Sequence, residues 1–204
     1  MRIELFIDYR SPYAYLANLD AKTWGTRIDY KPIDVMDVMA KINNTPTFSC
    51  APKLQYAGMD VTRWAHKHGI AFSPNQLLLQ ALGAGTFDGT LLTCAGLAAQ
   101  ELGVFDRVND ALFNAVWTAD DDLLTEEGRA AFLKTRNIDA VDLWELASDA
   151  KTVMLCKARS QEAVDRGVFG VPTTFVNDEM FFGNDRVDFV RAAISRALTA
   201  RASK

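Results

Sequence analysis

Strand-forming patterns occur only near the two ends of this chain, and a long helical stretch separates them. Residues 3–7 alternate as a strand, helical spacing follows as far as Gly25, and residues 27–30 predict a second strand. Near the other end, residues 171–176 and 180–182 predict a hairpin that precedes a last helix. A strand–helix–strand opening usually has parallel strands. The two ends are therefore predicted to form one α/β unit.

The middle of the chain has helical periodicity and almost no strand signal. Its apolar side chains recur at three- and four-residue intervals over residues 61–68, 74–82, 90–102, 104–117, 124–135, 140–148 and 151–166. A strand–helix–strand opening with a late hairpin and a closing helix is the thioredoxin topology. The predicted fold class is therefore α/β, a thioredoxin-like domain with a large all-helical insertion. Residues 1–40 plus 168–204 are expected to form the thioredoxin-like domain, and residues 41–167 the helical insertion domain.

Composition and charge exclude several classes of function. The 22 basic and 26 acidic residues leave a net charge of −4 without any block of like charge, so no nucleic-acid-binding surface is expected. No apolar run approaches the roughly 20 residues of a membrane span, and the strand pattern directly after Met1 and Arg2 predicts no signal peptide. Cys50, Cys94 and Cys156 are far apart and odd in number, which favours packing roles over a disulfide framework or a metal site. A reducing cytoplasm is the expected setting.

The junction between the first strand and the first helix is the most informative local feature. Ser11 is a favourable N-cap, and Pro12 suits the first helical turn. Thioredoxin-like folds carry a reactive cysteine at this junction, whereas this position holds a hydroxyl and no Cys-x-x-Cys occurs in the chain. A chain of this fold would need a thiol supplied by a cofactor. From the residues alone, Ser11 is either a hydrogen-bond donor to such a thiol or only the cap of its helix.

Several motifs resemble those of one known family. Asp8-Tyr-Arg-Ser-Pro-Tyr-Ala-Tyr-Leu-Ala17 is similar to the amino-terminal motif of the DsbA-like family that includes 2-hydroxychromene-2-carboxylate isomerases and kappa-class glutathione transferases. Gly167-Val-Phe-Gly-Val-Pro-Thr173 resembles the cis-proline loop of that family, and Phe181-Phe-Gly-Asn-Asp-Arg186 resembles its carboxy-terminal glutathione motif. Residues 53–64 and 112–117 also resemble parts of the family. The resemblance runs nearly end to end in the same order.

The resemblance implies glutathione as the cofactor, held by the turn at Ser11 and by the cis-proline loop at Val171 and Pro172. Ser11 would donate a hydrogen bond to the glutathione thiolate, and the dipole of its helix would also favour the anion. A cis bond between Val171 and Pro172 would let Val171 pair with the extended cysteinyl-glycine backbone. The residues alone favour an ordinary trans turn proline, so the isomer stays open.

Polar residues would hold the remaining groups of glutathione. Asp185 would accept the α-ammonium of the γ-glutamyl group, and Asn184 would bond its carboxylate, although Asp185 is equally well explained as a helix cap. Lys53 would pair with the glycine carboxylate, and Asn44 would add a hydrogen bond. A lone surface lysine is otherwise expected to be solvated. Weak candidates for the substrate pocket are Tyr13, Tyr56 and Trp64.

The resemblance implies a glutathione-dependent isomerase that acts on an aromatic chromene or benzylidenepyruvate-type substrate in aromatic catabolism. The expected partner is a small aromatic substrate, and the expected assembly is a homodimer. Two alternatives stay open: a kappa-like glutathione transferase or peroxidase, and a non-catalytic glutathione-binding protein of thioredoxin fold. Residues 44–50 and 72–80 match the family only loosely, which puts the substrate in doubt more than the cofactor.

Overall fold

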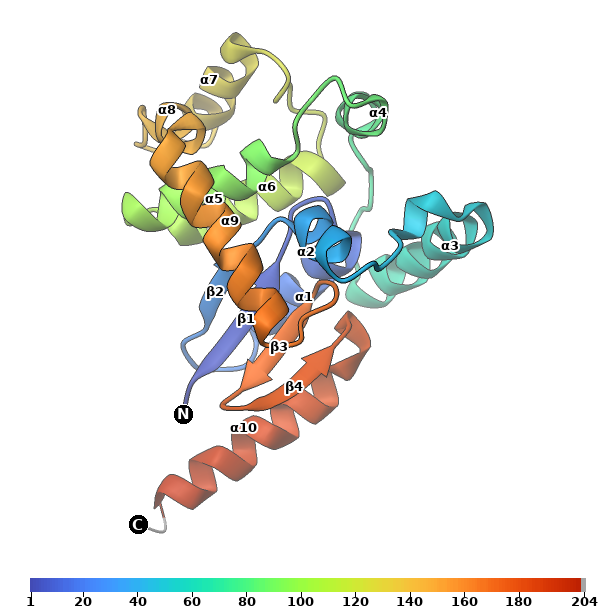
Figure 1. Ribbon diagram of the computed structural model, residues 1–204, viewed down its shortest axis with the longest axis vertical. Helices are drawn as coiled ribbons and strands as arrows, with labels where there is room; N and C mark the ends of the chain where they lie inside the picture. The colour runs from blue at the N-terminus through green and yellow to red at the C-terminus, as the bar shows by residue number, and fades with distance from the viewer. Residues whose placement is uncertain (203–204) are drawn as a thin grey trace. The chain divides into compact units, whose positions relative to one another are not determined.

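The computed structural model describes residues 1–202, and within them the strands lie only near the two ends of the chain (Figure 1). The amino-terminal end supplies β1 (Ile3–Ile7) and β2 (Asp29–Pro32), and the carboxy-terminal end supplies β3 (Thr173–Val176) and β4 (Glu179–Phe182). The sheet order is β2-β1-β3-β4. Strand β1 is parallel to β2 and antiparallel to β3, which is antiparallel to β4. The two ends of the chain thus form one mixed sheet, as predicted.

Helices make up most of the remaining described chain. In sequence order they are α1 (Pro12–Ala21), α2 (Val35–Lys41), η1 (Thr47–Ser49), α3 (Ala51–His68), α4 (Gln76–Ala84), α5 (Thr90–Glu101), α6 (Phe105–Trp117), α7 (Glu126–Thr135), α8 (Leu143–Ser148), α9 (Ala150–Asp165), η2 (Asn184–Arg186) and α10 (Val187–Ala202). Side-chain caps define several starts, because Ser11, Asp34, Asn75 and Thr125 each accept a backbone N–H of the helix that follows. Local capping therefore sets many of these boundaries.

Two helices differ from the sequence-based expectation. Helix α3 begins at Ala51, ten residues before the predicted start at Val61. Its first ten residues are all exposed or half-buried, although Leu54, Ala57 and Val61 keep helical spacing, so the predicted start was too late. Helix α2 spans only Val35–Lys41 and was not predicted as a separate element. It follows from the cap at Asp34, whose side chain accepts two backbone N–H groups.

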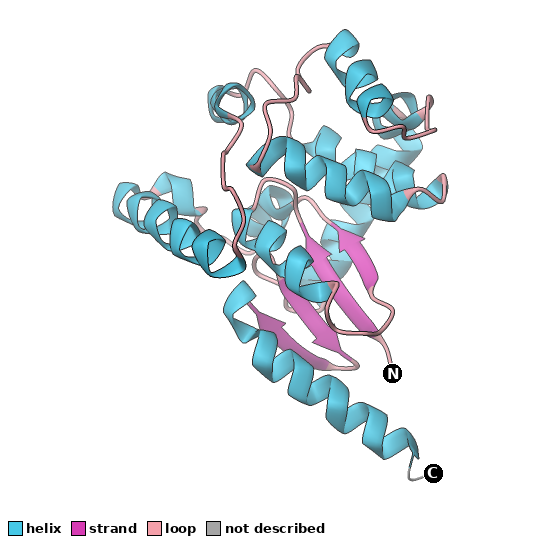
Figure 2. Cartoon of the chain, turned by 180° about the vertical axis from the view of Figure 1, so that it is seen from behind, coloured by secondary structure: helices cyan, strands magenta, loops and turns pink. Residues whose placement is uncertain are grey.

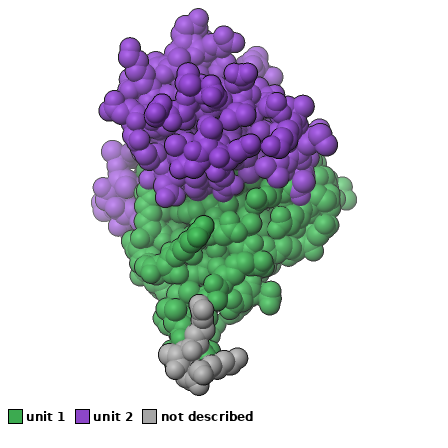
Figure 3. All heavy atoms as spheres, turned by 90° about the vertical axis from the view of Figure 1, so that its left-hand side faces the viewer, with its two compact units in different colours: residues 1–54, 159–204 green, residues 55–158 purple. Residues whose placement is uncertain are grey.

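The described chain divides into two compact units, which Figure 3 colours separately. The first unit contains Met1–Leu54 and the chain from Arg159 onward, and the second contains Gln55–Ala158. The first unit is thus larger than the predicted thioredoxin-like domain at both boundaries. Compactness does not measure independent folding, so the predicted domains, 1–40 plus 168–204 and 41–167, stay predictions.

The first unit is built around the central strand β1, whose residues are all buried. Helix α10 packs along β3, as the view from behind also shows (Figure 2). Glu4 of β1 is 2% exposed and forms ion pairs with Arg166, just after α9, at 2.9 Å and with Arg2 at 3.0 Å. The Arg166 guanidinium also lies 3.9 Å from the centre of the Phe175 ring. Paired cations thereby offset the cost of burying this carboxylate.

The second unit is helical and has an apolar core of its own. Helix α5 packs against α6 and α8, and its residues from Leu92 to Ala99 are all buried. Buried Asn75 caps α4 and also donates hydrogen bonds to the carbonyls of Ala115 and Asp121 at 3.1 and 2.8 Å. This single side chain therefore ties the start of α4 to the end of α6 and the loop beyond it.

The cysteines have the unpaired state that the sequence predicts. Cys94 and Cys156 are buried, Cys50 is half-buried, and all three are free thiols.

Among the described helices, none combines the length and apolarity needed to cross a membrane. Residues 1–202 also contain no cluster of three or more His, Cys, Asp or Glu side chains placed to hold a metal ion.

Candidate functional site

Ser11 lies where β1 passes through a short turn into α1, and it is half-buried. Its Oγ accepts a hydrogen bond from the backbone N–H of Ala14 at 3.2 Å, so Ser11 caps α1 as predicted. The same hydroxyl donates to the carbonyl oxygen of Val171 at 3.4 Å. A hydrogen bond of that length is weak, so the hydroxyl can turn toward a better acceptor at little cost.

The loop before β3 approaches Ser11 and contains a cis peptide bond between Val171 and Pro172. The structure thereby answers the question of the proline isomer that the residues left open. The carbonyl of Pro172 accepts a hydrogen bond from the backbone N–H of Gly183 at 3.0 Å, and the Thr173 hydroxyl donates to the carbonyl of Gly170 at 2.8 Å. The first bond joins the cis-proline loop to the turn that precedes α10, and the second lies within the loop. The predicted pairing of Val171 with a cofactor backbone stays a prediction.

Asn44 also contacts this loop, and its predicted hydrogen bond to glutathione stays a prediction. Its Nδ2 donates to the carbonyl of Phe169 at 2.8 Å, so the amide nitrogen is already engaged within the chain. The Phe169 ring lies 4.5 Å from that of Phe182, centre to centre. A Cβ at Gly170 would lie 2.9 Å from the Phe182 ring, so the glycine gives this loop its close approach to β4. The second N–H of the Asn44 amide and its side-chain oxygen are the groups that could bond glutathione.

The turn at Asn184 and Asp185 contains one buried and one exposed polar group. Asn184 is 4% exposed, and its Nδ2 has no hydrogen-bond partner among the described residues. The Asp185 side chain is 47% exposed and accepts from Arg186 Nη1 at 2.6 Å. No side chain caps η2, and Gly183 precedes it with φ at 104°, a backbone conformation that favours glycine. Asn184 therefore presents an unused buried donor, whereas Asp185 already has a cation beside it.

The other predicted residues lie outside this set of contacts. Lys53 is exposed in the first turn of α3, and none of the bonds described above involves it. Tyr13 is half-buried in the first turn of α1. Tyr56 and Trp64 belong to the part of α3 in the second unit, where Tyr56 is 57% exposed and the Trp64 ring has Lys67 Nζ 4.4 Å from its centre. The roles of these four residues in binding stay predictions.

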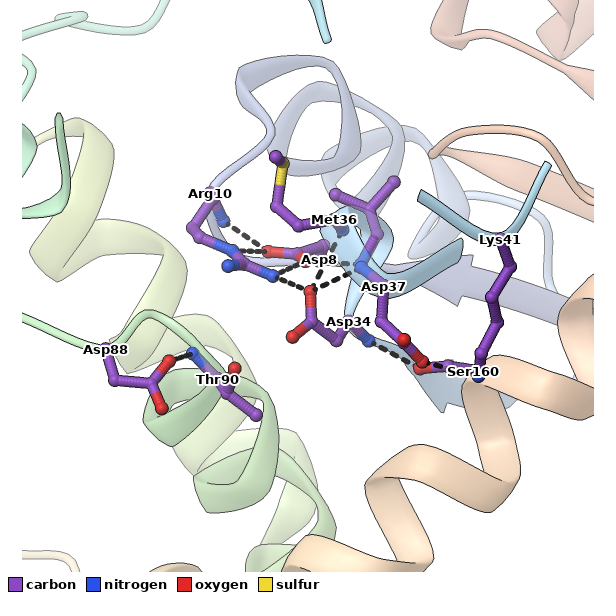
Figure 4. Close-up of polar contacts among 10 residues, drawn as sticks. Asp8, Arg10, Asp34, Met36, Asp37, Lys41, Asp88, Thr90 and Ser160 are labelled. Carbon is purple, nitrogen blue, oxygen red and sulfur yellow. Dashed lines mark hydrogen bonds and ion pairs between the residues drawn. The ribbon is translucent and has the colours of Figure 1, made fainter. Parts of the chain in front are cut away.

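The sequence-based analysis missed a charged cluster next to Ser11, shown in Figure 4. Fully buried Asp8 accepts hydrogen bonds from Arg10 Nε at 2.9 Å and Nη2 at 2.6 Å, and from the backbone N–H of Val35 at 2.9 Å. Arg10 Nη2 also donates to Asp34 at 2.5 Å. Burial lowers the pKa of Arg10, but the charge and hydrogen bonds of Asp8, followed by those of Asp34, outweigh burial and raise that pKa above its ordinary value.

Only part of this cluster has a signal in the sequence. An aspartate two residues before an arginine can bond locally, and Asp8 does accept the backbone N–H of Arg10 at 2.9 Å. The partner Asp34 is 24 residues away in the chain, so its pairing depends on β1 and β2 being neighbours in the sheet. No local pattern predicts that contact.

The sheet order, the helical insertion, the hydroxyl at the start of α1 and the cis-proline loop together define a thioredoxin-like protein of the DsbA architecture. The family model of the DSBA-like thioredoxin domain matches residues 2–195. The chain therefore belongs to the DSBA-like thioredoxin domain family, and the predicted fold class is confirmed.

The chain is similar to proteins named as isomerases and to one named as a kappa-class glutathione transferase. The 2-hydroxychromene-2-carboxylate isomerase of Sphingobium xenophagum is 29% identical, and the match covers 93% of this chain and 96% of the relative. Glutathione S-transferase kappa 1 of Caenorhabditis elegans is 22% identical over 93% of this chain and 88% of its own length. A solved structure of a 2-hydroxychromene-2-carboxylate isomerase has a TM-score of 0.82 at 26% identity, covering 100% of this chain and 98% of that one. Both names agree with the family expected from the motifs.

Proposed function

We propose that this protein is a glutathione-dependent isomerase of an aromatic chromene or benzylidenepyruvate-type substrate, acting in aromatic catabolism. The observation that carries the proposal is the position of Ser11: a hydroxyl caps α1, where it also bonds the carbonyl of Val171 in the cis-proline loop. The name shared by the isomerase relatives supports the reaction class, and the name of the kappa relative supports glutathione.

The residues around Ser11 fit glutathione as a cofactor. Asn184 has a buried amide N–H group without a partner among the described residues, and a carboxylate would satisfy such a donor. The cis-proline loop is bonded at Val171 to Ser11 and at Pro172 to Gly183, the residue before Asn184. Hydrogen bonds thus connect Ser11 to the turn that contains Asn184. Ser11, Val171 and Asn184 would hold the cofactor, with Asp185, Asn44 and Lys53 as further candidates. When bound, glutathione supplies the thiol nucleophile that the junction itself lacks.

In this proposal Ser11 stabilises an anion and does not act as a nucleophile. Its hydroxyl is only weakly engaged with Val171, so it can be redirected to a negatively charged sulfur. The amino-terminal end of α1 adds the positive end of a helix dipole. Both effects would lower the pKa of a thiol bound there from its ordinary value near 8.5. The glutathione thiolate would add to the conjugated double bond of the small aromatic substrate.

Glutathione stoichiometry tests the proposal. The purified protein is given 2-hydroxychromene-2-carboxylate together with glutathione at about one-hundredth of the substrate concentration, and substrate absorbance and free thiol are followed together. An isomerase converts all of the substrate while the thiol concentration stays constant. Loss of thiol in step with product would instead establish a transferase or peroxidase. Glutathione binding by calorimetry without turnover of chromene or aryl-halide substrates would establish a non-catalytic binding protein.

The three free cysteines bear on the cellular compartment in which this protein works. The unpaired state of Cys50, Cys94 and Cys156 is compatible with a reducing compartment, where reduced glutathione is available. We accordingly propose a cytoplasmic protein. Fractionation of the source cells tests this, because a periplasmic or secreted pool would contradict it.

A further inference from the structure

Two carboxylates lie beside the helix that begins at Ser11, and both are poorly solvated. Asp8 is fully buried, and the side chain of Asp34 is 14% exposed. Asp8 belongs to the turn that leads into α1, and Asp34 caps the start of α2. Low local dielectric strengthens the repulsion between such carboxylates and any anion bound nearby. The site proposed above requires an anion at Ser11, so these charges need to be offset.

Arg10 is the cation that contacts both carboxylates. Its guanidinium donates from Nε and Nη2 to Asp8 and from Nη2 to Asp34. Asp37, in the first turn of α2, is paired with Lys41 at the end of that helix at 2.7 Å, and both side chains are more exposed than Asp34. The backbone N–H of Asp34 donates to Ser160 Oγ at 3.1 Å, which is a neutral partner. Arg10 is thus the cation that Asp8 and Asp34 share.

The same cluster connects Arg10 to the backbone of the Ser11 turn. The backbone N–H of Arg10 donates to the Asp8 carboxylate at 2.9 Å, and the backbone N–H of Ser11 donates to the Asp8 carbonyl at 3.0 Å. Asp8, which Arg10 binds through its guanidinium, therefore also holds the backbone of Ser11. The Arg10 side chain is directed at the two carboxylates (Figure 4), so any effect on Ser11 runs through Asp8.

We propose that Arg10 is a positioning residue of the candidate site, which neutralises Asp8 and Asp34 and thereby allows a thiolate to be stable at Ser11. The proposal deepens the proposed function and rests on it. With Arg10 present the three side chains carry a net charge of −1, and without it they carry −2. Removing Arg10 therefore makes the surroundings of a thiolate more negative, whereas removing Asp34 makes them less negative.

An introduced thiol measures this effect without glutathione. Ser11→Cys, made together with Cys50→Ser to remove the half-buried native thiol, places a reporter sulfur at the start of α1. The pH dependence of its absorbance at 240 nm and of its alkylation rate gives its pKa. Adding Arg10→Gln should raise that pKa by about 0.5 to 1 unit, the order expected for the loss of one nearby charge in a partly buried setting. Adding Arg10→Lys should recover at least half of that shift.

Asp34→Asn provides the opposite test and keeps the fold. Asparagine is also a good N-cap, and the pair between Asp8 and Arg10 is retained. The pKa of the introduced thiol should fall by about 0.5 to 1 unit. Asp37→Asn is the matched control on the same helix and should change the pKa by less than about 0.2 unit, because Lys41 pairs with Asp37 on the more exposed side. The outcome stays informative even if Arg10→Gln fails to fold.

The possible results separate this inference from the proposed function. Opposite shifts for Arg10→Gln and Asp34→Asn support the role of Arg10, and equal titrations in all variants overturn it. The bound-glutathione titration of the parent chain is measured independently by ultraviolet absorbance. If the parent binds no glutathione while the introduced thiol responds as expected, the proposed function fails and the charge balance at Ser11 stands.

Discussion

At the scale of single residues, Ser11 makes two hydrogen bonds of unequal strength. The bond from Ala14 N–H fixes the start of α1, and the long bond to the Val171 carbonyl leaves the hydroxyl hydrogen available for another acceptor. The first is structural, and the second is the contact that a bound anion would replace. One side chain can therefore serve both as a helix cap and as an anion donor, so the two interpretations of Ser11 are compatible.

Ser11→Ala should separate these two roles. Loss of the cap should reduce the free energy of unfolding by about 1 kcal/mol. Glutathione affinity should stay within about tenfold, while the pKa of the bound thiol should rise because its hydrogen-bond donor is gone. Denaturant unfolding, calorimetry and ultraviolet thiolate absorbance measure the three quantities. Thr125→Ala is the matched control, since Thr125 caps α7 at 3.0 Å in the other unit and should lower stability without changing the thiol titration.

Asp185 is predicted to contribute to glutathione affinity, but less than a buried carboxylate would. Its side chain is half exposed and already pairs with Arg186, so solvent and that cation weaken any bond to the γ-glutamyl ammonium. Asp185→Ala should therefore weaken binding by only about two- to tenfold in calorimetry. Asp188→Ala removes the same charge from the first turn of α10 and should leave affinity unchanged. Equal losses in both variants would indicate a general charge effect.

At the scale of elements, the start of α7 is held by a compact set of contacts. The Asp122 carboxylate accepts the Thr125 hydroxyl and the backbone N–H of Leu124, and Thr125 caps Gly128. Gly128 lies so close that a Cβ there would be 2.1 Å from the carbonyl oxygen of Asp122. The packing of one loop against one helical turn therefore requires a glycine inside a helix, where glycine is normally unfavourable.

Gly128→Ala should reverse the usual effect of this substitution. Alanine inside a helix is generally about 1 kcal/mol more favourable than glycine. At Gly128 the backbone contact must shift, so the free energy of unfolding should fall by more than about 1 kcal/mol. Gly58→Ala in α3 is the matched control, because no atom lies within 4 Å of its Cβ, and it should be neutral or stabilising. Stabilisation by both changes would contradict the packing argument.

The Asp122 carboxylate should also give α7 a pH dependence. Hydrogen bonds from the Thr125 hydroxyl and then the Leu124 N–H lower the pKa of Asp122 from 3.8, so the folded state favours the ionised carboxyl. That stability is fully present above the unfolded-state pKa and is lost as the pH falls through the lower folded-state pKa. The difference in unfolding free energy between the parent and Asp122→Asn should therefore be largest near neutral pH. Urea unfolding between about pH 2.5 and pH 7 measures it, and a constant difference would contradict the assignment.

At the scale of the whole molecule, apolar side chains remain exposed at one edge of the sheet. Strand β4 is an edge strand with Met180 40% exposed, and the neighbouring α10 carries Phe189 at 62% and Leu198 at 50%. An unpaired edge strand with apolar neighbours is a common site of association. We propose that these residues take part in the homodimer that the family resemblance implies.

Light scattering should give a mass of about twice the 22.6 kDa of the chain. Phe189→Glu should shift the protein toward the monomer, because it places a charge within the exposed apolar group on α10. Val141→Glu is the control, since Val141 is 85% exposed in the second unit. A monomeric parent at all concentrations would contradict the predicted assembly.

Much of the architecture was predictable because its signals are local. The alternation of residues 3–7, the cap at Ser11 and the hairpin near residue 177 each lie within a few residues, and each prediction agrees with the structure. Helix α3 was only partly predicted: Leu54, Ala57 and Val61 keep helical spacing, but none of its first ten residues is buried, and the predicted start fell at Val61. For the candidate site, the sequence indicated Ser11, Pro172 and Asn184 but not the pairing of Arg10 with Asp8 and Asp34.

The amino-acid sequence by itself determined where the strands and most helices lie, and it placed a hydroxyl where related folds carry sulfur. Tertiary structure alone decided the contacts between distant segments: Ser11 with Val171, 160 residues away, Asn44 with Phe169, and Arg10 with Asp34. It also decided that Val171–Pro172 is cis. The physical reason is one of range. Capping and periodicity act over one or two turns of chain, whereas these bonds form only when the sheet brings its strand ends together.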